Sequence, residues 1–482
     1  MLDLRPVVHL VGMLTFALGA IMLLPLFVDW QAGNDNWQGF AQSAFLTCLI
    51  GGIATLSTRA SLDQGLGRRQ SFLMTGSVWA VLPAFGALPF MFGMPNQTLT
   101  HAYFEAMSGM TTTGTTVFVG LDDMPPGVLL WRSILQWLGG LGIIVVALVF
   151  LPILRVGGMQ HFQSEAFDTM GKVMPRVFDI SAALLQVYLG LTLLAIMAYM
   201  AFGMSGFDAL NHGLTTIATG GFSTRDASFS AFVGPLEYVS AVFMILAGLP
   251  FIRFIQLMGG SVRAIWQDVQ VRAFLRWVAY AVAAVVAYRL ATTDAGVLDV
   301  LRGTVFNVIT LFTGTGYGSE DVSDWGDFPL LVVMLVGFIG ACTASTGCSI
   351  KVFRFLVLFE AIKMRMRQLS SPRRVMAIKL GGKRLEQDVI NSVIVMFSAF
   401  AGIFLMLVVA LALTGLETRT ALTAAWTAIC NIGPVFGPEV GPTGAVHEFP
   451  ERAKWLMIFG MYLGRLEVMA VLVLLLPRFW RA

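Results

Sequence analysis

Hydrophobic residues recur along the whole chain in runs of roughly 20, separated by short polar stretches. A run of about that length crosses the hydrocarbon core of a bilayer as one helix. The pattern predicts ten spanning helices, some of them interrupted, at residues 9–29, 38–57, 72–94, 129–153, 182–203, 236–258, 274–291, 328–355, 390–414 and 453–476. We therefore expect an all-α polytopic membrane protein without a separate soluble domain.

Four short segments rich in threonine and glycine break this pattern, and each lies between two apolar runs. They read YFEAMSGMTTTGTTVF (103–118), ALNHGLTTIATGGFST (209–224), VFNVITLFTGTGYGSE (305–320) and AWTAICNIGPVFGPEV (425–440). Their alignment superimposes one glycine from each segment, namely Gly114, Gly220, Gly316 and Gly433. A polar residue precedes each of the first three glycines by the same number of positions, namely Glu105, Asn211 and Asn307 in that order.

This recurrence predicts a repeated unit of helix, re-entrant segment and helix. Each segment would enter from outside as a half-helix, too short to span, and return as an extended strip. The predicted division is a two-helix preface at 1–60, followed by pore units at 70–155, 180–260, 272–358 and 388–477.

Lipid offers no hydrogen-bond partners to the backbone N–H and C=O groups of such irregular strips. Such backbone must be buried in protein or line a water-filled path. The C-terminal end of a half-helix favours a cation, and a ring of carbonyl oxygens can replace the water around a monovalent cation. The alternative is that the small residues only pack helices closely. The predicted filter residues are Thr112, Thr113, Gly114, Ala218, Thr219, Gly220, Gly314, Thr315, Gly316, Asn431, Ile432 and Gly433.

Composition agrees with a membrane protein, since 57% of the residues are hydrophobic and only 12% are charged. Basic residues fall in one set of loops: Arg59, Arg68, Arg69, Lys172, Arg176, Arg263, Arg272 and the stretch from Lys363 to Arg384. Acidic residues gather in the other set. The positive-inside rule then predicts that both termini are cytoplasmic. The first apolar run has no clear cleavage site, which favours a retained helix over a signal peptide.

The stretch GFIGACTASTGCSIKVFR (337–354) interrupts the eighth apolar run with small and hydroxyl residues. Such a run favours an unwound loop, although a small-residue packing face is the alternative. The loop residues are Ala341, Cys342, Thr343, Ala344, Ser345, Thr346, Gly347, Cys348 and Ser349. Lys351 is expected to snorkel at the inner mouth.

Arg465 is expected in the middle of the last spanning helix, where a charge is costly and faces a cavity or a partner. It would oppose cation passage or hold the loop, and an ion pair with another helix is the alternative. Glu467 is two residues away and therefore on a different helix face. Glu105 is expected to brace the first strip through hydrogen bonds, while His101 and His212 are expected to be packing or rim residues.

Together these motifs resemble the Trk, Ktr and HKT superfamily of potassium transporters and channels, and most closely its bacterial TrkH family. The four segments match that family's filter segments in order, and WRSILQWLGGLGIIV (131–145) and YLGRLEVMAVLVLL (462–475) also resemble its pattern. The resemblance implies four membrane–pore–membrane pseudo-repeats around one pore, in a homodimer of the bacterial inner membrane. It also implies a gating loop below the filter, the arginine of the last helix, and a cytosolic nucleotide-binding partner of the TrkA type.

The transported ion implied is K⁺, with no bound organic cofactor. Glycine at all four aligned positions favours potassium over sodium, whereas the sequence Asn431-Ile432-Gly433-Pro434 sets the fourth strip apart from the others. A proton- or sodium-coupled secondary transporter remains the alternative, although its inverted repeats and buried carboxylates are not evident. No HExxH or GxSxG motif points to an intramembrane enzyme. No GxGxxG or Walker A motif is present, so nucleotide control requires a partner.

Overall fold

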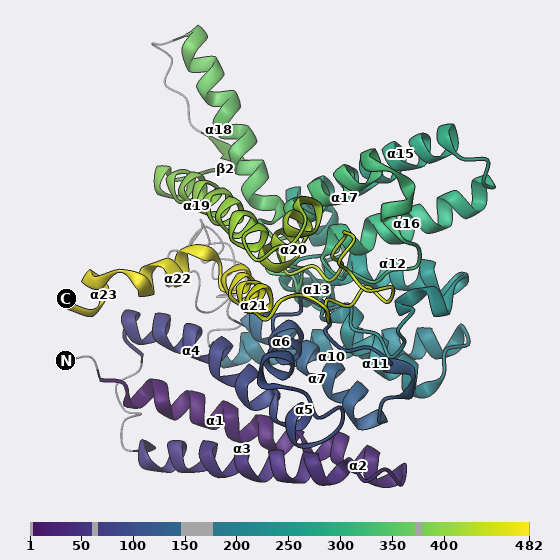
Figure 1. Cartoon of the computed structure of the whole chain (residues 1–482). Coiled ribbons are helices and arrows are strands. Elements are labelled where there is room, and N and C mark those ends of the chain that lie inside the picture. Colours follow the sequence, from purple (N-terminus) through teal and green to yellow (C-terminus); the bar gives the residue numbers. More distant parts are fainter. Residues whose placement is uncertain (1–2, 60–65, 146–176, 372–377, 482) are drawn as a thin grey trace.

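The computed structural model describes residues 3–59, 66–145, 177–371 and 378–481, and nearly all of its regular structure is helical (Figure 1). The first half contains α1 (Arg5–Ile21), α2 (Leu23–Gln31), α3 (Trp37–Ser57), α4 (Arg68–Gly86), α5 (Leu88–Phe92), α6 (Leu99–Met110), α7 (Pro126–Val145), α10 (Val177–Ala201), α11 (Gly206–Ile217), α12 (Pro235–Ala247) and α13 (Phe251–Met258). α1 packs along α3 and against α4, at the edge of the molecule.

The second half of the described chain is also mainly helical. It contains α14 (Arg263–Gln267), α15 (Val269–Thr292), α16 (Val297–Thr313), α17 (Asp327–Ile339), α18 (Val352–Ser370), α19 (Gln387–Ala412), α20 (Thr418–Cys430), α21 (Glu451–Arg465), α22 (Val468–Leu475) and α23 (Pro477–Arg481). A two-stranded hairpin, β1 (Lys379–Leu380) and β2 (Lys383–Arg384), follows α18. α18 projects from the body, and both termini lie on one side of it (Figure 1).

Four short helices, α6, α11, α16 and α20, each end in a non-helical strip, and their neighbours close a circle. α7 packs against α11, α12 against α16, α17 against α20, and α21 against α6. Each of these four helices therefore lies beside the helix that follows the preceding strip. The arrangement brings all four strips to the middle of the molecule.

Seven helices in the described residues are long and apolar enough to cross a membrane, or up to nine if each of two bent pairs is one span. The prediction of ten spans included three that are not continuous helices. The sixth turns by 91° between α12 and α13, and the last turns by 109° between α21 and α22. The eighth is divided into α17 and α18 by non-helical residues 340–351, within the stretch expected to unwind.

The breaks have local causes. Pro250 precedes α13 and has no N–H to continue a helix. Gly340 ends α17 with φ +70°, and Glu467 interrupts the last span with φ +59°, a left-handed angle that is uncommon for glutamate. The predicted end of the fourth span at residue 153, together with Lys172 and Arg176, lies outside the described residues.

Candidate functional site

The four Thr- and Gly-rich strips meet at one place and touch one another in chain order. We number them as strip 1 (111–118), strip 2 (218–224), strip 3 (314–320) and strip 4 (431–437). A methyl group on Gly114 would lie 2.1 Å from the carbonyl oxygen of Gly220, so strips 1 and 2 are in contact. A methyl group on Gly221 would lie 2.0 Å from the carbonyl oxygen of Thr315, which joins strips 2 and 3 in the same way.

Strip 4 completes the circle. A methyl group on Gly316 would lie 2.6 Å from the backbone nitrogen of Gly433. On its other side, the Thr115 hydroxyl of strip 1 donates a hydrogen bond of 2.8 Å to the Gly433 carbonyl. The strips thus form a closed ring in which a side chain at Gly114, Gly221 or Gly316 would clash with backbone.

Backbone angles define which residues correspond between the strips. Left-handed φ angles recur in alternation at Thr112 (+54°) and Gly114 (+90°), Thr219 (+52°) and Gly221 (+76°), Gly314 (+83°) and Gly316 (+84°), and once in strip 4, at Asn431 (+52°). Gly221 therefore has the place that the sequence alignment gave to Gly220. The sequence Thr-Gly-Gly offered two glycines, and the alignment took the earlier one. Ala218 lies outside the equivalent stretch and packs against Gly140 of α7, where a methyl group would come within 2.9 Å of its Cα.

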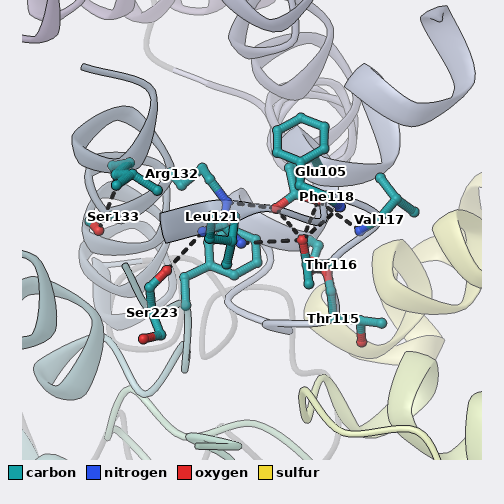
Figure 2. A network of polar contacts seen from close by, with 12 residues as sticks. Glu105, Thr115, Thr116, Val117, Phe118, Leu121, Arg132, Ser133 and Ser223 are labelled. Carbon is teal, nitrogen blue, oxygen red and sulfur yellow. Dashed lines mark hydrogen bonds and ion pairs between the residues drawn. The ribbon is translucent and has the colours of Figure 1, made fainter. Parts of the chain in front are cut away.

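A buried carboxylate braces strip 1, as Figure 2 shows. Glu105 of α6 accepts hydrogen bonds from the Thr116 hydroxyl at 2.9 Å and the Val117 backbone N–H at 3.0 Å. Arg132 of α7 donates its Nε–H to the same carboxylate at 2.8 Å. The side chains of Glu105 and Arg132 are 0% and 1% exposed, so each depends on the other for compensation of its charge.

Arg132 also connects strip 1 with strip 2. Its Nη1 donates to the Ser223 carbonyl at 2.9 Å, and its guanidinium lies 4.1 Å from the centroid of the Phe222 ring. One guanidinium group therefore holds the outer ends of two strips from different parts of the chain.

Strips 2 and 3 are held by a side chain at the equivalent helix position, but the residue types differ from those of strip 1. His212 lies 3.1 Å from the Ser223 hydroxyl, and Asn307 donates to the Ser319 hydroxyl at 3.0 Å. With Gly221 as the reference, His212 has the position of Glu105, and the expected Asn211 instead bonds within its own helix. His212 is fully buried, so it packs within the brace and does not lie at the rim.

Above the ring, a cavity of about 880 Å³ opens. Its lining includes one glycine from each strip: Gly114, Gly221, Gly316 and Gly433. At its edge, Arg225 bonds to Asp208 at 3.1 Å and to Asp122 at 3.2 Å. These two hydrogen bonds raise the pKa of Arg225 above its ordinary value, so its positive charge is fixed.

On the opposite side of the ring lies the non-helical stretch between α17 and α18. A methyl group on Gly347 would lie 2.8 Å from the Thr313 carbonyl at the base of strip 3, and one on Gly314 would lie 3.7 Å from the Cys348 nitrogen. The Ser349 hydroxyl donates to the Cys430 carbonyl at 3.2 Å, at the base of strip 4. The predicted loop residues therefore do meet the lower ends of the strips.

The bend between α12 and α13 receives this loop. Cys342 N–H donates to the Gly248 carbonyl at 3.1 Å, and Phe251 N–H donates to the Ala344 carbonyl at 2.9 Å. The Thr346 hydroxyl donates to the Ala247 carbonyl at 3.1 Å. Predicted loop residues buried by this packing are Ala341, Cys342, Thr343, Ala344, Ser345, Thr346, Gly347 and Cys348.

Arg465 reaches the loop, although not from the middle of a helix as expected: it is the last residue of α21. Its Nη1 donates to the Cys348 sulfur, and its Nη2 donates to the Gly139 carbonyl at 2.8 Å. The carboxylate of Glu467, placed by the break after α21, pairs instead with Arg354 of α18. Lys351 has φ +80° and is 6% exposed, so it is buried and does not snorkel.

The site also includes residues that were not predicted, among them Arg132, Gln136 and Tyr317. Gln136 bonds to strip 2 from α7, and the Tyr317 hydroxyl contacts those of Thr215 and Thr216. For Arg132 a signal existed, because an arginine inside an apolar run is costly and needs a partner. Nothing in the apolar pattern pointed to Gln136 or Tyr317.

Comparison with known proteins gives one consistent result. Residues 37–481 match the family model TrkH, described as a cation transport protein. The potassium uptake protein TrkI of Halomonas elongata is 37% identical, covering 99% of this chain and 97% of its own, and TrkH of Escherichia coli K12 is 34% identical, covering 99% of each. The crystal structure of the potassium transporter TrkH from Vibrio parahaemolyticus superimposes with a TM-score of 0.91 at 32% identity, covering 100% of each chain. The chain therefore belongs to the TrkH family of cation transport proteins.

Proposed function

We propose that this protein mediates potassium uptake through the ring of four strips, as a Trk-system transporter. The observation that carries the proposal is the closed contact of the strips below a cavity lined by a glycine of each. Backbone carbonyls around one axis replace the hydration shell of K⁺. The relatives named as potassium uptake proteins match along nearly the full chain, which supports potassium as the ion.

The proposed filter follows the register of the backbone angles. It consists of Thr112–Gly114, Thr219–Gly221, Gly314–Gly316 and Asn431–Gly433. The loop Ala341–Ser349 is the proposed gate, because it packs against the lower ends of strips 3 and 4. Arg465 holds that loop through Cys348 and adds a positive charge below the filter.

The proposal includes orientation and assembly. Both termini and the basic stretch that contains α18 face the cytoplasm of a bacterial inner membrane, in keeping with the charge pattern. The protein acts as a homodimer with a cytosolic nucleotide-binding subunit of the TrkA type. Labelling of a single cysteine added at the C-terminus from the periplasmic side alone would contradict the orientation. A monomeric mass in light scattering would contradict the dimer.

Tracer uptake into proteoliposomes tests the function directly. We expect the purified chain to take up ⁸⁶Rb⁺, with K⁺ competing and Na⁺ failing to compete at equal concentration. Uptake only after addition of the cytosolic partner would mean that the gate is closed in its absence. Uptake that Na⁺ inhibits as well as K⁺ would overturn the proposed selectivity.

The Gly316→Ser variant is expected to lose most of the discrimination between K⁺ and Na⁺. Its φ of +84° is strained for serine, and the added Cβ would lie 2.6 Å from the Gly433 nitrogen, so strips 3 and 4 must separate. Gly318→Ser is the matched control, because a methyl group there meets nothing within 4 Å. Competition of K⁺ and Na⁺ against ⁸⁶Rb⁺ measures the effect. Equal selectivity in both variants would contradict the filter assignment.

A further inference from the structure

One filter position differs from its counterparts in having no side chain. Backbone N–H groups donate to the carbonyl five residues earlier in three strips: Thr113 to Ser108 at 2.9 Å, Gly220 to Thr215 at 2.9 Å, and Ile432 to Thr427 at 3.1 Å. In strip 3, Thr315 precedes Gly316 as Thr113 precedes Gly114. The residues at this level are therefore Thr113, Gly220, Thr315 and Ile432.

The three side chains at this level are buried and packed beside the ring. The Thr113 hydroxyl lies 2.7 Å from that of Thr111, and the Thr315 hydroxyl lies 3.0 Å from that of Thr313. Ile432 is 0% exposed. In strip 2 the residue at this level is Gly220, which has no side chain to fill the corresponding place.

A side chain from another helix fills that place. A methyl group on Gly220 would lie 2.3 Å from Cδ and Oε1 of Gln136, which projects from α7 and is 0% exposed. The Gln136 amide donates to the Gly220 carbonyl at 2.6 Å and accepts from the Phe222 N–H at 3.0 Å. Both ends of the amide are thus bound to the backbone of strip 2.

The Gly220 carbonyl oxygen is also the atom nearest to a methyl group placed on Gly114, across the junction of strips 1 and 2. Its direction therefore affects two strips. A buried carbonyl and N–H that lose their partner are costly, and the backbone then moves to find new ones. Gln136 is consequently able to set the spacing of strip 2 in the ring.

We propose that Gln136 is a specificity-determining positioning residue, which replaces the missing side chain of Gly220 and fixes its carbonyl in the filter. This inference rests on the proposed function, because it concerns ion selection by the same ring. Gln136 acts through strip 2 and does not itself contact the ion.

Gln136→Leu tests the proposal, since leucine keeps the bulk and removes both hydrogen bonds. We expect the ratio of the K⁺ and Na⁺ inhibition constants against ⁸⁶Rb⁺ uptake to fall by about tenfold, the effect of losing roughly 1.4 kcal/mol. Ser133→Ala is the control, because among the described residues this buried hydroxyl on α7 bonds only to the Leu129 carbonyl of its own helix. Wild-type selectivity in a folded Gln136→Leu protein would overturn the inference.

A second test combines substitutions at Gly220 and Gln136, and its outcome does not depend on whether the Gln136→Leu protein folds. Gly220→Thr alone would clash with Gln136 and is expected to abolish uptake. Adding Gln136→Ala should restore selective uptake, because the threonine then supplies the side chain that strips 1 and 3 have at this level. A double variant no better than Gly220→Thr would contradict the inference. Failure of the wild-type protein to select K⁺ would instead refute the proposed function.

Discussion

Replacement of Arg132 by methionine is expected to lower the free energy of unfolding by about 3 to 5 kcal/mol. The substitution leaves the Glu105 carboxylate buried without its countercharge, and removal of one partner from a buried ion pair typically costs about that much. It also frees the Ser223 carbonyl and the face of the Phe222 ring. Thermal unfolding in detergent, followed by the fluorescence of a thiol-reactive dye on the four free cysteines, measures the loss.

The companion variants separate the charge from the packing. Glu105→Gln should also destabilise, because it leaves the Arg132 charge unpaired. The double variant Glu105→Gln with Arg132→Met should be more stable than the sum of the single effects predicts, since no buried charge remains. Additive effects would contradict a direct ion pair, whatever the size of each.

Replacement of Arg465 by glutamine is expected to raise cation flux between about tenfold and a hundredfold. Two like charges about 6 Å apart at an effective dielectric constant of about 20 repel by about 3 kcal/mol, and a barrier lower by that amount is crossed roughly a hundred times faster. The substitution also weakens the bond to Cys348 that holds the loop. Initial rates of ⁸⁶Rb⁺ uptake into proteoliposomes measure the change.

Arg276→Gln provides the matched control, because it removes an arginine from the exposed face of α15. Its flux should equal that of the wild type. A second route to the same result is to shorten the loop within Ala341–Ser349, which should raise flux without a change in charge. If neither the Arg465 variant nor the shortened loop conducts faster, the gate assignment is incorrect.

The sequence was sufficient to predict the helical membrane fold, because apolar runs and threonine–glycine segments depend on local composition. It also placed the unwound stretch after α17, since small and hydroxyl residues there break the apolar period. The alignment of strip 2 on Gly220 was one residue early. Composition alone cannot decide between Gly220 and Gly221, because only the backbone angles distinguish them.

Other features depended on contacts between distant segments. Arg465 was expected in the middle of a helix, since its neighbours are apolar. The helix instead breaks after Arg465, and the Glu467 carboxylate at the break pairs with Arg354 of a distant segment. Gln136 lies in an apolar run whose pattern is satisfied whether or not one polar residue reaches a strip. Such residues are found only when the partner, here Gly220, has been brought close by the fold.

The closure of the ring has a consequence for biosynthesis. Thr115 and Val446 secure strip 1 to the last quarter of the chain, through the Gly433 carbonyl at 2.8 Å and the Thr116 carbonyl at 2.9 Å. During translation, strips 1 to 3 are made before α20 and α21, so they cannot form the closed ring until those helices have left the ribosome. A nascent chain that stalls before then leaves backbone groups of these strips unpaired within the bilayer, where lipid cannot satisfy them and the protein is unstable. Nonsense mutations late in the gene should therefore reduce the amount of protein and not only its transport rate.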